Sequence, residues 1–169
     1  MKYTNFLPLM AVLLFSVAAC GPSREEAAAF NDSIINEQKA VIETYDALLE
    51  SYDTYEGEKM DAALENFTAQ IKRSLTAVNN ISSISGGDKL KHAAGDCFAV
   101  YLSVAENEAP EMVRLYKVPE GDFTTDMRVQ WDGIYKSVDT KLKDADKKFI
   151  EVQTKFADDF KLTLDKSDK

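Results

Sequence analysis

The sequence predicts an all-α protein: an up-down-up-down antiparallel four-helix bundle that follows an N-terminal signal peptide. Apolar residues recur in four long rows at the period of a helix, about 3.6 residues. No stretch alternates apolar and polar side chains over the length of a strand. The first 19 of the 169 residues have the composition of a targeting segment. The remaining chain is long enough for one domain with one core.

The targeting segment begins with Lys2 and continues with an apolar run over residues 6–15. This run is shorter than the roughly 20 residues that span a bilayer. Small residues then precede Cys20, and Ala18-Ala19-Cys20 resembles the bacterial lipobox, in which the cysteine is acylated and becomes the first residue. An ordinary signal peptide with a chance cysteine is the alternative. Gly21 follows in place of an aspartate, which favours the outer membrane, at its periplasmic face or at the cell surface.

The expected organisation is a signal peptide over residues 1–19, a lipidated Cys20 with a short tether over 20–23, the bundle over 24–164 and a disordered tail over 165–169. The first helix is expected to start at a capping box, Ser23 with Glu26, and to close at Gly57. The second is expected to end at Gly86 and Gly87.

The third apolar row runs from Leu90 to Leu115 and contains Pro110, which predicts a kink or break near residues 106–110. The last row runs from Met127 to Phe160, with Thr124 or Thr125 as its cap. Trp131 belongs to this row and is predicted to be buried. Short connections make the first and last helices expected neighbours in the bundle.

Charge and composition exclude several function classes. The chain has 20 basic and 29 acidic residues, a net charge of −9, which becomes −10 when Lys2 is removed with the leader. Binding to nucleic acid or attraction to anionic lipid is therefore not expected. One histidine and two cysteines are too few for a zinc site.

No catalytic constellation is present in the sequence, and we expect a non-enzymatic protein without cofactor or metal. Phosphate-binding glycine loops, nucleophile elbows and His-Glu metal motifs are missing. Cys97 lies in an apolar row and is expected to be a buried hydrophobe, and His92 is expected on the outer face. Oxygen-bearing side chains at every second position from Glu120 to Asp126 suggest either a calcium loop or a turn with a helix cap.

Acidic residues concentrate on the first helix. Four of them step by three or four residues and form one stripe on the face away from the apolar row: Glu43, Asp46, Glu50 and Asp53. One interpretation is a solvated face whose flank meets the lysines of the last helix. The other is a docking stripe for a basic protein partner.

Aromatic side chains gather at the end of the bundle away from the tether, namely Tyr52, Tyr55, Tyr116 and Phe123. Tyrosines at helix ends often cap a core with their hydroxyl groups in water. Alternatively, they form a contact patch or a platform on which a sugar stacks. Tyr52 and Tyr55 join the acidic stripe as candidate partner-binding residues.

The last helix carries a resemblance. Trp131, followed by the run Phe149-Ile150-Glu151-Val152-Gln153-Thr154-Lys155-Phe156-Ala157 and Leu162, resembles the last helix of a family of uncharacterised bacterial surface lipoproteins with helical bundles. The resemblance implies a helical fold and an envelope location, and transfers no active site. The predicted function is a lipid-anchored binding module. The alternative is an envelope protein that holds an apolar small molecule between its helices.

Overall fold

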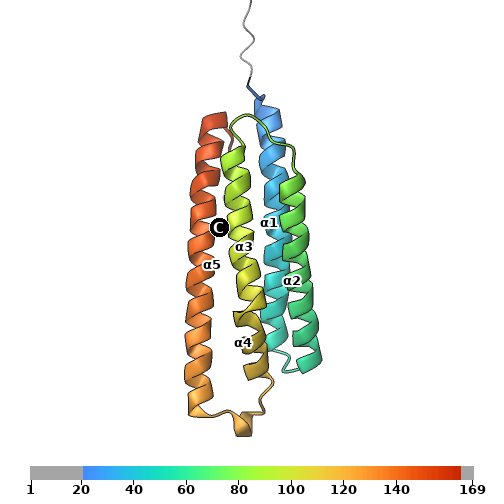
Figure 1. Cartoon of the computed structure of the whole chain (residues 1–169), viewed down its shortest axis with the longest axis vertical. Helices are drawn as coiled ribbons and strands as arrows, with labels where there is room; N and C mark the ends of the chain where they lie inside the picture. The colour runs from blue at the N-terminus through green and yellow to red at the C-terminus, as the bar shows by residue number, and fades with distance from the viewer. Residues whose placement is uncertain (1–20, 165–169) are drawn as a thin grey trace, which may run out of the picture.

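The computed structural model describes residues 21–164, and this part of the chain is helical with no strand. Its elements are α1 (Arg24–Tyr52), α2 (Gly57–Asn80), α3 (Asp88–Glu106), α4 (Glu108–Tyr116), a 3₁₀ turn η1 (Glu120–Asp122) and α5 (Thr125–Phe160). Figure 1 shows them as long rods lying side by side, with α4 prolonging α3. The predicted all-α class is confirmed.

The helices share one core, although they do not contact one another equally. α1 packs mainly against α2, α2 also against α3, and α3 against α5, whereas α1 and α5 touch at few positions. The largest side chains that are fully buried come from α1 to α5 alike: Phe67, Phe98, Phe149, Ile34, Leu48, Met60, Ile71, Leu90 and Leu115. All of these belong to the helical apolar rows or lie beside them.

Several helix ends follow local signals in the sequence. The Ser23 hydroxyl accepts a bond from the Glu26 amide, and the Glu26 carboxylate accepts one from the Ser23 amide, which completes the capping box. Thr124 caps α5 by accepting a bond from the Met127 amide. The predicted break in the third row is confirmed, because α3 ends at Glu106 and α4 starts at Glu108. Pro110 lies in the first turn of α4, where no backbone donor is needed.

Other helix ends differ from the sequence expectation. α1 ends at Tyr52 rather than at Gly57, because Tyr55 takes a left-handed conformation with φ of 54° and turns the chain. Gly57 instead becomes the first residue of α2. α2 ends at Asn80, and Gly86, with φ of +85°, lies in the connection to α3.

The predictions for the targeting segment concern residues that the structure does not describe. The signal peptide, the acylation of Cys20 and the tail over 165–169 all lie outside residues 21–164. Among the described helices, none is both long and apolar enough to cross a membrane.

Candidate functional site

The acidic stripe of α1 lies on the surface. Glu43, Asp46, Glu50 and Asp53 are all exposed. Within the described residues, no ion pair joins any of the four to a lysine of α5. Two α5 lysines are instead paired elsewhere, Lys141 with Glu108 of α4 and Lys143 with Asp139 of its own helix. The exposure of the stripe fits both interpretations, a solvated face and a docking stripe, and both stay predictions.

Beside the stripe, α1 exposes two large aliphatic side chains. Ile42 is 36% exposed and Leu49 is 38% exposed. Asn31 shows which side of α1 points toward α5, because its Oδ1 accepts a hydrogen bond of 3.1 Å from Nε2 of Gln153 on α5. Leu49 follows Asn31 by 18 residues, about five full turns, so it points to the same side of α1. Leu49 therefore faces toward α5, and Ile42 lies close to the same line.

α5 presents a matching row to α1. Tyr135, 48% exposed, precedes Gln153 by 18 residues and thus shares its direction. Asp139 and Asp146 lie on the same flank of α5. The Tyr45 ring of α1 is close to this row: burial, followed by the nearby charges of Tyr135, Asp139, Asp46 and Asp146, raises the pKa of Tyr45 to about 12.

We call this surface the α1–α5 seam and define it by three residues of α1 and two of α5: Ile42, Tyr45, Leu49, Tyr135 and Asp139. At its upper end the two helices meet through Phe30 and Phe156, whose ring centroids are 5.8 Å apart. Below this contact, the exposure of Ile42 and Leu49 shows that the seam is not closed by packing.

The lower end of the seam is an aromatic ladder of four rings. Tyr52 stacks on Tyr116 with centroids 4.3 Å apart, and Trp131 stacks on Tyr135 at 5.3 Å. Tyr116 and Trp131 join the two stacks edge to face at 6.0 Å. Tyr52 is 4% exposed, so its ring cannot contact a partner directly.

Trp131 is only partly buried, and the prediction that it is a core residue is wrong. The physical reason lies in the length of α5, whose first turns run past the ends of the neighbouring helices (Figure 1). Between Thr125 and Ser137 the helix has no buried residue. Trp131 therefore packs against the edge of the core and against Tyr116 and Tyr135 rather than fully inside the bundle.

Tyr55 and Phe123 lie apart from this ladder. Tyr55 is 79% exposed in the turn between α1 and α2. Phe123 is partly buried and lies under the Arg128 guanidinium, 5.8 Å from the ring centroid. The distal aromatic residues thus divide into a packed ladder and one exposed ring, that of Tyr55.

A polar cluster inside the bundle was not predicted. The Tyr101 hydroxyl of α3 donates to the Asp146 carboxylate of α5, 3.0 Å from Oδ2, and Cys97 Sγ lies 3.6 Å from Oδ1. Burial raises the pKa of Asp146, and the bonds from Tyr101 and Cys97 offset part of this shift. Burial also raises the pKa of the Cys97 thiol, so Cys97 is a buried neutral thiol as expected, and His92 is exposed as expected.

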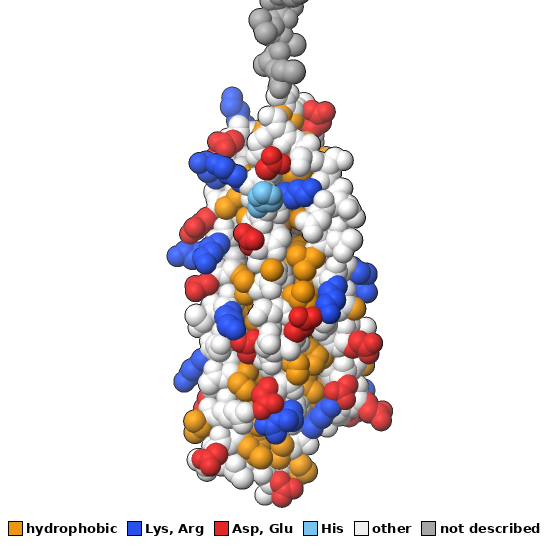
Figure 2. All heavy atoms as spheres, viewed as in Figure 1, with side chains coloured by type: hydrophobic (Ala, Val, Ile, Leu, Met, Phe, Trp, Pro, Cys, Tyr) orange, Lys and Arg blue, Asp and Glu red, His pale blue; other side chains and the backbone are white. Residues whose placement is uncertain are grey.

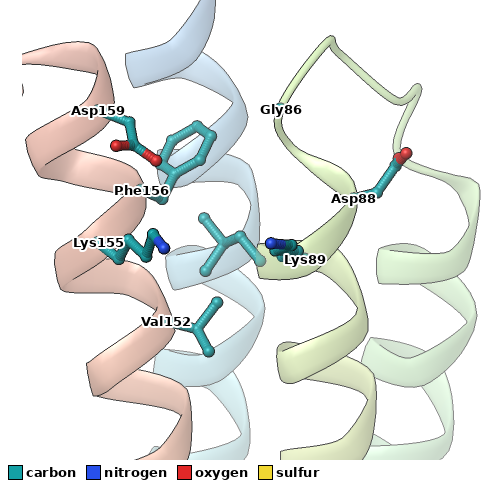
Figure 3. A pocket seen from close by; sticks show the side chains of 8 residues that line it. Gly86, Asp88, Lys89, Val152, Lys155, Phe156 and Asp159 are labelled. Atoms are coloured by element: carbon teal, nitrogen blue, oxygen red, sulfur yellow. The ribbon is translucent and has the colours of Figure 1, made fainter.

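Grooves on the surface of the described residues have linings of mixed polarity. One lies between the start of α3 and the end of α5, and its lining includes Asp88, Lys89, Val152, Lys155 and Asp159 (Figure 3). The face seen in Figure 2 mixes acidic and basic side chains around apolar strips. Within the described residues, no group of histidine, cysteine or carboxylate side chains is arranged to hold a metal ion.

The loop from Glu120 to Asp126 forms a 3₁₀ turn followed by the Thr124 cap of α5. Of the two interpretations offered for its alternating oxygens, the turn with a helix cap describes its conformation.

Comparison with known proteins adds no relative: no family model, curated protein or solved structure matches the chain. The resemblance of the last helix to surface lipoproteins stays a prediction.

Proposed function

We propose that the protein is a lipid-anchored, non-enzymatic binding module of the bacterial outer membrane. In this proposal it is an up-down-up-down antiparallel four-helix bundle, held to the membrane through Cys20, and its α1 face binds a basic protein partner. One observation carries the proposal: the acidic stripe of α1 is exposed, and within residues 21–164 no ion pair joins it to α5. A row of like charges along one helix costs folding stability, and such a row attracts a partner of opposite charge.

The anchor is supported by the sequence around Cys20 and by the first structured residues. Three residues, Gly21 to Ser23, separate the cysteine from α1, a reach of about 10 Å. An acyl chain on Cys20 would therefore hold the bundle close to the headgroups. Both loops at the lower end in Figure 1 would face away from the membrane.

Cross-linking in cells tests the binding function. A photo-reactive residue is placed at Glu50, in the stripe, and in a matched control at Glu65, an exposed position of α2. We expect a discrete adduct with another protein from position 50 that is absent from position 65, and that disappears when Glu43 and Asp46 are replaced by their amides. Equal adducts from both positions, or adducts that survive the replacements, would refute docking through the stripe.

The alternative function, an apolar small molecule held between the helices, has less support. Large side chains from every helix except the 3₁₀ turn fill the centre of the bundle. The described grooves expose charged side chains, such as Lys89 and Asp159. An apolar ligand would leave these groups without water or a partner.

A further inference from the structure

We propose that the α1–α5 seam receives a basic, amphipathic α-helix of the partner protein. This inference rests on the proposed function and specifies the class of partner and where it lies. The partner helix would place its apolar side chains between α1 and α5 and its basic side chains along the two edges, as helices bind in hydrophobic grooves.

The floor of the seam is apolar and open. Ile42, Leu49 and Tyr135 are exposed by 36%, 38% and 48%. They account for half of the six large hydrophobic side chains exposed in the described residues. Ile42 and Leu49 are seven residues apart, about two helical turns, which is a spacing that a second helix matches with its own apolar row.

The edges of the seam are acidic, and their carboxylates fall opposite one another. Contacts between residues 31 and 153 and between 30 and 156 set the register of α1 against α5, and the two helices run in opposite directions (Figure 1). Extended along two regular helices, this register places Asp46 level with Asp139, and Asp53 level with Asp132. The Tyr45 hydroxyl responds to the charges of both Asp46 and Asp139, which supports the first of these pairings.

Two pairs of carboxylates therefore stand at matching heights on the two sides of the seam, two turns apart, with Leu49 and Tyr135 between them. We call each pair, Asp46 with Asp139 and Asp53 with Asp132, a rung. Lys143 pairs with Asp139 from the outer side, and Lys136 is exposed on the outer side of α5. A partner helix with basic residues at positions i and i+7 would place a cation at each rung. Charge complementarity thus selects a basic helix over a neutral or acidic one.

Other occupants fit less well. A second copy of the chain carries the same net charge of −9, so two copies repel each other overall. Residues 165–169 carry no apolar side chain to cover Ile42 and Leu49. An apolar small molecule would bring no cation to Asp46, Asp53 or Asp132.

The test uses the full-length protein in detergent and a synthetic probe. The probe is a leucine–lysine peptide of about five turns whose leucines lie on one helical face. Two control peptides are used, one with the same composition in scrambled order and one with glutamate in place of lysine. Emission of Trp131, the only tryptophan in the chain and part of the ladder at the lower end of the seam, reports binding.

We expect the amphipathic basic peptide to bind, to shift Trp131 emission to shorter wavelength, and to bind less tightly as salt increases. The apolar variant, Ile42→Ser with Leu49→Ser, should weaken binding at least tenfold. The charge variant, Asp46→Asn with Asp53→Asn, should weaken it severalfold and reduce its salt dependence. The replaced side chains are exposed, and removing facing carboxylates relieves repulsion, so both variants should fold.

Each variant has a matched control. Val129→Ser removes an apolar side chain that is 67% exposed and points away from the bundle. Glu58→Gln with Glu65→Gln removes two exposed carboxylates of α2 with the same seven-residue spacing as Asp46 and Asp53. Both controls should bind the peptide as the unaltered chain does.

Three outcomes overturn the inference. The scrambled peptide binds as tightly as the amphipathic one, the control variants lose as much affinity as the seam variants, or the amphipathic basic peptide does not bind. These outcomes leave the proposed function standing if the adduct from position 50 persists in cells. A photo-reactive residue at Leu49 that cross-links the chain to a second copy of itself would also overturn it. Loss of the cellular adduct alone would instead refute the function.

Discussion

Asp146 links two helices through its carboxylate, and burial of this carboxylate lowers the stability of its ionised form. Its carboxylate lies between α5 and α3, where the Tyr101 hydroxyl and the Cys97 thiol reach it. Burial raises the pKa of Asp146, so the ionised form is disfavoured in the folded chain. The bonds from Tyr101 and Cys97 favour that same ionised form but do not fully offset its loss of hydration.

The stability of the protein should therefore depend on the ionisation of Asp146. In the unfolded chain an aspartate has a pKa of about 3.9. The folded chain holds the Asp146 proton more tightly, so the free energy of unfolding falls as pH rises from the unfolded pKa through the folded pKa. Asp146→Asn keeps an oxygen acceptor for Tyr101 and removes the charge. We expect it to raise the melting temperature at pH 7 by about 2–4 °C, for a gain of about 1 kcal/mol.

Thermal melts from pH 3.5 to 8 measure this effect. The gain from Asp146→Asn should vanish toward pH 3.5, where the carboxyl group is protonated in both states. Asp144→Asn, at an exposed position of the same helix, is the control and should change little. A lower melting temperature of Asp146→Asn at pH 7 would mean that the charged hydrogen bonds outweigh burial.

At the scale of elements, the glycines that flank and interrupt α3 act in opposite ways. Gly87 is buried at the start of α3, where an added Cβ would lie 2.8 Å from Cγ1 of Ile84 and 2.9 Å from the Phe30 ring. Phe30 in turn packs on Phe156 of α5. The absence of a side chain at Gly87 thus lets the connection between α2 and α3 lie directly against the core. Gly95 lies inside α3 with open space around its Cα.

Alanine substitutions at these two positions should shift stability in opposite directions. Gly87→Ala overpacks the contact with Phe30 and Ile84, and we expect a loss of about 1–3 kcal/mol. Gly95→Ala improves the helix without a clash, with an expected gain of about 0.5–1 kcal/mol. Urea unfolding of both variants, followed by circular dichroism, makes the comparison. A loss in both would mean that the surface around Gly95 is not open.

Helices could be predicted from the sequence where apolar residues recur over a long row at the period of a helix. Helix ends could be predicted only where a local signal, such as a capping side chain, marks them. The capping box at Ser23, the Thr124 cap and the break before Pro110 are such local signals. The end of α1 at Tyr52 depends instead on the left-handed conformation of Tyr55, which residues other than glycine seldom adopt. The partial exposure of Trp131 depends on the unequal lengths of α5 and its neighbours, which no single row encodes.

At the scale of the whole molecule, the candidate site joins helices that are distant in sequence. The stripe on α1 was visible in the sequence because it repeats at helical spacing. Its neighbours on α5, Tyr135 and Asp139, were not, because the register of the two helices is set by the contacts of Phe30 and Asn31. The Asp146 cluster was not predicted from the sequence for the same reason, since its three residues come from two helices.

The proposed anchor makes a prediction for the location of the whole protein. Cys20→Ala removes the thiol that would carry the lipid, so the variant should lose stable attachment to the outer membrane. Membrane fractionation and sensitivity of processing to globomycin measure this. Cys97→Ala, at the buried thiol, is the control and should leave location unchanged. Normal outer-membrane retention of Cys20→Ala would refute the anchor.

The acidic stripe gives opposite expectations for folding and for binding. Glu43 and Glu50 are exposed and repel the neighbouring Asp46 and Asp53 along α1, so Glu43→Gln with Glu50→Gln should leave the free energy of unfolding equal or slightly higher. The same change should slow association with a basic partner, and the difference should fade as salt rises above about 0.15 M. Urea unfolding and association kinetics at several salt concentrations separate the two effects. A loss of stability above about 1 kcal/mol would show that these carboxylates are paired within the bundle, and docking through the stripe would then lose its physical basis.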